Sequence, residues 1–332
     1  LGLNFAGEWQ DPATPTSSRS WIVDPAAWAP TLRLNEILAW NVSGIPGFAG
    51  KPDLVEIHNF GPDAIDLGGM SLTDDPGWPQ RHVFPGGAVV AGNGFLVLEA
   101  GGAVGPLALP FQLDRLGEGL YLFDSPARGG ALLDSIQFGR QLADGSLGRL
   151  PDGQWGLCRP TFGAPNLAQP LGDPARLAIN EWLAAPAAPY AVDFVELYNP
   201  GDLPVSLAGL QLLPSEVARP SQPSIPAASF IGPGQTAWLA SSPAGDLPAI
   251  PWPAELPEEQ GVIGLFDPAG APIDIVFYGP QRAGLSQGRS PDGGGRIITF
   301  DFPSPGLSNP DLPSNPSAPG GPGRVWISEL VA

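Results

Sequence analysis

The stretch Asp53–Asn59, DLVEIHN, decides the fold, because it recurs as Asp193–Asn199, DFVELYN. Each stretch follows a shorter recurring one, LNE at 34–36 and INE at 179–181. Segments that recur in the same order indicate a repeated structural unit. The sequence therefore predicts two copies of one domain.

The repeat continues to the end of each copy, and Arg149 and Arg289 lie 140 residues apart. Three further pairs of segments keep this order: Leu122–Asp124 with Leu265–Asp267, Asp134–Gly139 with Asp274–Gly279, and Ser146–Gly153 with Ser286–Gly293. Residues 1–30 match neither copy, while 327–332 resemble the first strand of a third. We predict an N-terminal extended segment or tail of a preceding domain over 1–30, domains over 31–170 and 171–312, and a Pro/Gly linker with an orphan strand over 313–332.

The spacing of glycine and proline selects strands over helices. The chain has 45 glycines and 43 prolines among its 332 residues, and both residue types destabilise helix interiors. Between them lie short runs rich in Val, Leu, Ile, Phe and Trp, a pattern typical of strands joined by turns. We predict an all-β protein in which each copy is a two-sheet sandwich of about seven to nine strands.

The charge balance argues against two classes of partner. The formal net charge is −18, which repels phosphate backbones and anionic lipid surfaces. No apolar run approaches the ~18 residues of a membrane span, so we expect neither nucleic-acid binding nor membrane insertion. The single cysteine, Cys158, rules out an intrachain disulfide. Because Leu1 is not a start methionine, we expect a processed or excised part of a longer protein.

The recurring segments together resemble the lamin tail domain of the bacterial extracellular type. The resemblance rests on 34–36, 53–59, the turn Asp66–Gly69, the loop Ser146–Gly153 and the closing Gly163–Asn166, whose second-copy counterpart is Gly306–Asn309. It implies an immunoglobulin-like β-sandwich without catalytic activity, often in tandem in large secreted or surface proteins. The basic surface of animal lamin tails is missing here, so their nucleic-acid role is not carried over.

Four glutamates recur inside otherwise apolar strands, Glu36 and Glu56 in the first copy and Glu181 and Glu196 in the second. A buried carboxylate needs a cation or hydrogen-bond donors to offset its desolvation. Our hypothesis is that one glutamate of each pair binds the loop arginine bidentately and so holds the closing loop to the sandwich. The residues of this structural role are the four glutamates together with Arg149, Asp152, Arg289 and Asp292.

No constellation in the sequence predicts catalysis, a cofactor or a metal centre. Gly284–Gly288 fits G-x-S-x-G, but no helix can follow it, and the two histidines, His58 and His82, are in the other copy. Zinc needs about four closely spaced ligands, and no such spacing occurs. Calcium binding at Asp74–Asp75 or in the Glu258–Glu259 loop is left open.

The ten tryptophans give a further lead. Trp155, Trp182 and Trp238 lie in repeat strands and are expected in the core. The others stand near turns or strand ends, where exposed rings would stack on sugars or on another subunit, although a single tryptophan is more often buried. They are Trp9, Trp21, Trp28, Trp40, Trp78, Trp252 and Trp326.

We therefore expect a non-catalytic spacer, adhesion or assembly module of a secreted or cell-surface bacterial protein, with protein partners or self-association. One alternative is a filament subunit whose C-terminal strand adds to the next subunit's sheet through Val325, Trp326, Ile327 and Leu330. Another is a set of accessory domains, with glycan binding as one form, beside the catalytic domain of a secreted hydrolase.

Overall fold

The computed structural model describes residues 31–101, 105–218, 224–240, 249–252 and 255–311, together with the backbone of 8–10 and 18–20. The described part is nearly all β, as predicted. Its helices are two single 3₁₀ turns, Pro126–Arg128 (η1) and Pro174–Arg176 (η2). None of the helices in this described part is long and apolar enough to span a membrane.

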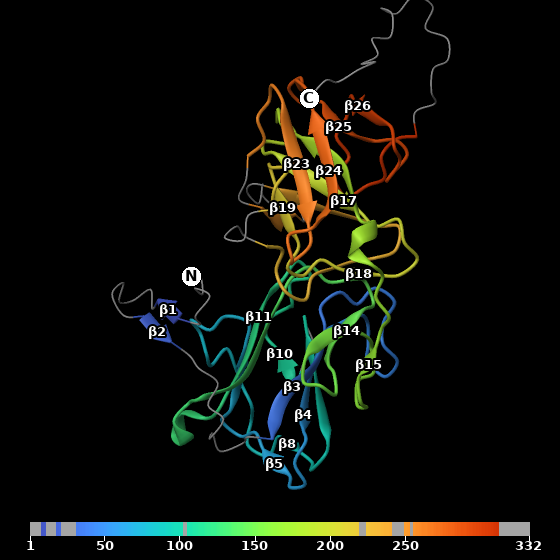
Figure 1. The fold of residues 1–332 in the computed structure, drawn as a ribbon. Coiled ribbons are helices and arrows are strands. Elements are labelled where there is room, and N and C mark those ends of the chain that lie inside the picture. The colour runs from blue at the N-terminus through green and yellow to red at the C-terminus, as the bar shows by residue number, and fades with distance from the viewer. Residues whose placement is uncertain are drawn as a thin grey trace, which may run out of the picture.

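Residues 32–168 form two main sheets and one short strand pair (Figure 1). The larger sheet has the order β10(Ala108–Leu109), β9(Phe95–Ala100), β4(Asp53–Asn59), β3(Leu32–Leu38), β13(Ser146–Arg149), β14(Trp155–Arg159), β15(Leu167–Ala168). The smaller has the order β12(Leu132–Phe138), β11(Glu118–Phe123), β6(Ser71–Thr73), β7(His82–Val83). The pair is β5(Ile65–Asp66) with β8(Val89–Val90).

Residues 178–300 repeat this arrangement. The larger sheet has the order β22(Ile250–Pro251), β21(Thr236–Ala240), β17(Phe194–Tyr198), β16(Ala178–Leu183), β25(Ser286–Arg289), β26(Ile297–Phe300). The smaller contains β19(Gln211–Leu213), β23(Gly261–Phe266) and β24(Pro272–Tyr278), and β18(Val205–Ser206) pairs with β20(Phe230–Ile231). Each half has more strands than predicted, because two-residue pairings such as β5 with β8 also form.

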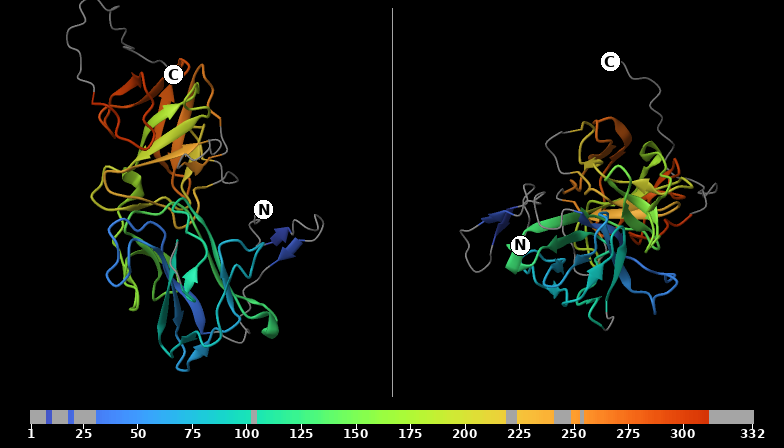
Figure 2. Two further views of the ribbon diagram at one scale, coloured as in Figure 1. Left: turned by 180° about the vertical axis from the view of Figure 1, so that it is seen from behind. Right: turned by 90° about the horizontal axis from the view of Figure 1, so that it is seen from below.

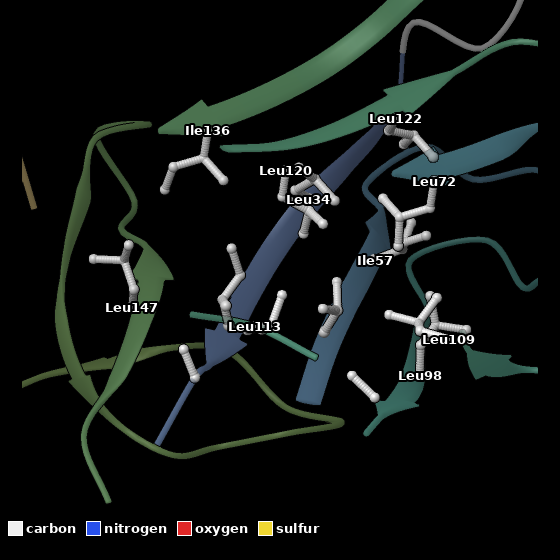
Figure 3. Packing of buried hydrophobic residues seen from close by; sticks show 14 of the residues in the cluster. Leu34, Ile57, Leu72, Leu98, Leu109, Leu113, Leu120, Leu122, Ile136 and Leu147 are labelled. Carbon is white, nitrogen blue, oxygen red and sulfur yellow. The ribbon is translucent and has the colours of Figure 1, made fainter. Parts of the chain in front are cut away.

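The main core of the first half lies between its two sheets. Figure 3 shows Leu34 and Ile57 of the larger sheet facing Leu120 and Leu122 of the smaller one. A separate cluster in the second half includes Trp182, Leu197 and Ile263. On β4 and β11, alternate residues supply these side chains, because successive residues point to opposite faces of a sheet.

The two sets of sheets lie end to end (Figures 1 and 2). Among the described residues, no strand of one set pairs with a strand of the other. The division into domains over 31–170 and 171–312 remains a prediction.

Beyond these sets, β1(Glu8–Gln10) pairs with β2(Ser18–Ser20). The other residues of 1–30, and the predicted assembly strand with Val325, Trp326, Ile327 and Leu330, lie outside the described residues.

Candidate functional site

The glutamates of the first half lie side by side on two neighbouring strands. Glu36 of β3 is opposite Glu56 of β4, next to an irregularity in the strand register. Both side chains are fully buried. A fully buried carboxylate needs several donors nearby, because it has lost its hydration.

Hydrogen bonds from strand residues and from the segment that follows β14 satisfy these carboxylates. We call residues 160–166, and 301–309 in the second half, the closing segments. Glu36 accepts from Ser146 Oγ at 2.5 Å and from the backbone N–H of Thr161 at 3.0 Å. Glu56 accepts from Asn35 Nδ2 at 2.7 Å and from the backbone N–H of Gly163 at 2.5 Å. The pair thus ties the segment after β14 to the centre of the larger sheet.

The second half repeats this geometry with a different loop sequence. Glu181 accepts from Ser286 Oγ at 2.5 Å and from the backbone N–H of Ser304 at 3.0 Å. Glu196 accepts from Asn180 Nδ2 at 2.9 Å and from the backbone N–H of Gly306 at 2.6 Å. Thr161 and Ser304 each donate a backbone N–H and a hydroxyl to the glutamate, so the contact is kept although the residue differs.

Two asparagines complete the attachment of the closing segments. Asn166 Nδ2 donates to the carbonyls of Asn35 and Arg149, both at 2.9 Å. Asn309 Nδ2 donates to the matching carbonyls of Asn180 at 3.2 Å and Arg289 at 2.9 Å. We assigned no role to either asparagine from the sequence, although their recurrence at the end of each copy was visible there.

Burial raises the pKa of all four glutamates. For Glu56 it raises the pKa to about 7, against the opposing effect of the Gly163 and Asn35 donors. For Glu196 it raises the pKa to about 8, against the donors on Asn180 and Gly306. The neighbouring glutamate raises both values further, since two like charges in one site disfavour each other.

The prediction that Arg149 and Arg289 each bind a buried glutamate is wrong. Arg149 forms its salt bridge with Asp134 at 2.7 Å, and Arg289 forms its salt bridge with Asp274 at 2.9 Å. These aspartates lie on β12 and β24, in the opposite sheet from the glutamates. The arginines therefore cross-link the two sheets, while the glutamates hold the closing segments through neutral donors.

Further contacts place each arginine against its own loop. Arg149 donates to the carbonyls of Leu34 and Gly153, and Arg289 donates to those of Ile179 and Gly294. Each arginine thus joins a central strand, the loop and an aspartate of the facing sheet. Such a guanidinium spans several acceptors because its donors form a rigid fork.

Asp152 and Asp292 differ although their sequence positions match. Asp292 accepts from Asn180 Nδ2 at 2.9 Å and from the backbone N–H of Asn309 at 2.8 Å. Asp152 accepts a hydrogen bond from the backbone N–H of Gln154, in an exposed turn. Asp292 therefore takes part in loop attachment, whereas Asp152 stabilises a local turn.

The other polar residues considered for catalysis or metal binding make contacts that stabilise the fold. The His58 ring stacks on Phe95 with centroids 4.3 Å apart, and Ser286 Oγ is bonded to Glu181. Asp74, one of the calcium candidates, forms a salt bridge with Arg81. Within the described ranges, no group of three or more His, Cys, Asp and Glu side chains could hold a metal ion.

The tryptophans divide differently from our expectation. Trp182 and Trp238 are buried as expected, but so is Trp252, whose Nε1 donates to the carbonyl of Leu212 at 2.7 Å. Trp155 is partly buried and packs against the core cluster of the first half, and the Arg149 guanidinium lies over its ring. Trp78 is 59% exposed.

Trp40 is partly buried, under the Arg115 guanidinium. The side chains of Trp9, Trp21, Trp28 and Trp326 lie outside the described residues.

A site that sequence analysis missed joins the two halves, just after β12. The N–H of Gly139 donates to the carbonyl of Ala227 at 3.1 Å, and the N–H of Phe230 donates to the carbonyl of Arg140 at 2.8 Å. Gln141 Nε2 donates to the carbonyl of Ala228 at 2.7 Å. These residues come from the end of β12 and from the segment around β20, so the contact is formed by two turns.

Arg140 and Phe230 anchor this junction from opposite sides. The Arg140 guanidinium donates to the carbonyls of Phe230 at 2.9 Å and Thr236 at 3.1 Å. Burial is the largest effect on Arg140 and lowers its pKa to about 10. Phe230 is 3% exposed and packs in the core cluster of the first half. A side chain of one half thus belongs to the hydrophobic core of the other.

Comparison of the chain with models of protein families, with curated proteins and with solved structures gives no match.

Proposed function

We propose that this chain is a non-catalytic structural module, a spacer or adhesion element of the lamin-tail type in a secreted or cell-surface bacterial protein. The recurring polar residues support this role. Glu36, Glu56, Glu181 and Glu196 each accept two or more hydrogen bonds from their own half. Carboxylates held in this way attach loops to sheets and are poorly placed to reach a substrate.

The junction is the observation that carries the proposal. A spacer must hold its parts at a fixed separation, and flexible contact between domains is the usual case. Here Phe230 of the second half is buried in the core of the first, and Arg140 of the first half donates to two carbonyls of the second. These contacts resist bending, because moving the halves apart would expose Phe230 and leave Arg140 without those acceptors.

The charge of the chain supports a partner other than nucleic acid. With a net charge of −18, its surface repels the phosphate backbone of nucleic acids. The proposed partners are proteins, including further copies of the same chain.

Distance measurement between the halves tests the spacer role. The exposed residues Asp152 and Glu259 are replaced by cysteines that carry spin labels. Double electron–electron resonance between the two labels then measures the distance between the halves. We expect one narrow distance distribution for the parent chain and a broader one for Arg140→Met. Arg159→Met, which removes an exposed arginine, is the matched control and should leave the distribution narrow. A broad distribution in the parent chain would contradict a rigid spacer.

A further inference from the structure

The turn that forms the junction in the first half has an uncovered counterpart in the second. Gly139 and Gly279 occupy matching positions after β12 and β24. A Cβ on Gly139 would lie 1.9 Å from Ser229 Oγ, whereas a Cβ on Gly279 would meet nothing within 4 Å. Gly139 is buried, while Gly279 and Pro280 are exposed. We call Gly279–Gln281 the tail turn.

The opposite side of the junction also has a counterpart, in the first half. The N–H of Leu67 donates to the carbonyl of Ala88, and the N–H of Leu207 donates to the carbonyl of Ser229. Ala88 and Ser229 are therefore equivalent positions in the two halves. Ile65 pairs with Val90 as Val205 pairs with Ile231. The residue at the position of the buried Phe230 is therefore Val89.

Val89 is 50% exposed in the turn Gly86–Val90, which we call the head turn. The backbone of this turn has the shape used at the junction, since Gly87 has a φ of 84° and its counterpart Ala228 has a φ of 52°. In Figure 1, β8 lies at the end of the first half that points away from the second half. The head turn therefore lies away from the internal junction, which its counterpart in the second half helps to form.

We propose that the head turn of one chain docks onto the tail turn of a second copy and repeats the internal junction between molecules. This inference rests on the proposed structural role and names its partner. The contact is heterologous, because different surfaces meet, and a heterologous contact that does not close into a ring forms an open chain of subunits.

Main-chain groups explain why the counterpart turns can use the same geometry. At the internal junction, the N–H of Gly139 and the carbonyl of Arg140 bond to the carbonyl of Ala227 and the N–H of Phe230. The same groups exist on Gly279, Pro280, Gly86 and Val89. Hydrogen bonds of this kind do not depend on the identity of the side chain.

Side-chain differences predict that the contact between molecules is the weaker one. Pro280 replaces Arg140 and lacks its guanidinium, and Val89 buries less apolar area than Phe230. The internal junction also joins parts of one chain, which raises their effective concentration. Reversible association that increases with protein concentration is therefore expected.

Sedimentation velocity on the 332-residue chain at increasing concentration tests the proposal. We expect the parent chain to form dimers and larger species, and Gly279→Glu and Gly86→Glu each to remain monomeric. Neither glycine has a Cβ contact within 4 Å or a positive φ, so both variants should keep the parent's melting temperature. Gly295→Glu, at another open glycine of the second half, is the control that should still associate.

Mixing the two variants separates this contact from any other. Gly279→Glu keeps an intact head turn and Gly86→Glu keeps an intact tail turn, so their mixture should form dimers and nothing larger. A parent chain that stays monomeric at about 1 mM, or a Gly279→Glu variant that still associates, would overturn the proposal. The rigid spacer is judged separately by the spin-label distances, which do not require self-association.

Discussion

Gly139 approaches Ser229 so closely that a Cβ on the glycine would lie 1.9 Å from the serine Oγ. The first residue follows β12 and the second precedes β20, so this contact joins the two halves of the chain. Glycine is needed where a neighbouring side chain lies this close to the backbone, because a Cβ would take the space that the serine hydroxyl occupies. The same glycine recurs at position 279, where nothing lies within reach.

Gly139→Ala should therefore weaken the junction, and Gly279→Ala should not. The added methyl group would push against Ser229, at a cost of about 1–3 kcal/mol if the turns cannot separate. We expect a broader distance distribution between the halves for Gly139→Ala and a lower midpoint of urea unfolding. Equal behaviour of the two variants would show that the close approach does not hold in solution.

Phe230→Ala should destabilise the first half although the residue belongs to the second. Phe230 is 3% exposed within the first core cluster, and removal of a buried phenylalanine costs about 3–5 kcal/mol. Phe302→Ala is the matched control, because that ring is 83% exposed. Urea unfolding followed by fluorescence gives the free energy of unfolding for both variants. If Phe230→Ala unfolds with the same free energy as the parent chain, the role of Phe230 is refuted.

A double-mutant cycle distinguishes the observed arginine partners from those we expected. Arg289→Met and Asp274→Asn remove the two ends of a partly buried salt bridge, so each should cost about 2 kcal/mol or more and their effects should not add. Arg289→Met and Glu181→Gln should instead be nearly additive. A large coupling energy between Arg289 and Glu181 would instead support the glutamate–arginine pairing.

The buried glutamates predict that the protein is more stable in mild acid than in mild alkali. The pKa of Glu196 is raised from 4.5 to about 8 in the folded protein, so between these values the folded state binds more protons than the unfolded state. Its contribution to stability is present below pH 4.5 and is lost as the pH rises through about 8. The melting temperature should therefore fall between pH 5 and pH 9.

Glu196→Gln should reduce this pH dependence, because the amide does not titrate. Glu259→Gln, at an exposed position, should leave it unchanged. Scanning calorimetry over the same pH range measures both. If the melting temperature of Glu196→Gln falls with pH as steeply as that of the parent chain, the carboxyl of Glu196 is not the source of the pH dependence.

The architecture could be predicted because it depends on local patterns. The short apolar runs between glycines and prolines, and the recurrence of Asp53–Asn59 at Asp193–Asn199, suffice to predict strands in a repeated order. The burial of Glu36, Glu56, Glu181 and Glu196 also follows from their apolar neighbours, and the structure confirms it.

The partners of these residues could not be predicted in the same way. Arg149 reaches Asp134 and not Glu36, because the arginine crosses to the facing sheet while the closing segment covers the glutamates. Which side chains meet across two layers depends on strand register and sheet packing, and these arise only when the whole chain has folded.

The amino-acid sequence by itself determined the all-β class, the repeat and the polar residues that each copy keeps. Only the tertiary structure decided what those residues bind and that Gly139, Arg140 and Phe230 join the halves. The physical reason is that strand propensity and hydrophobic periodicity act between neighbours in sequence, whereas hydrogen bonds and salt bridges between sheets depend on distances between residues far apart in the chain.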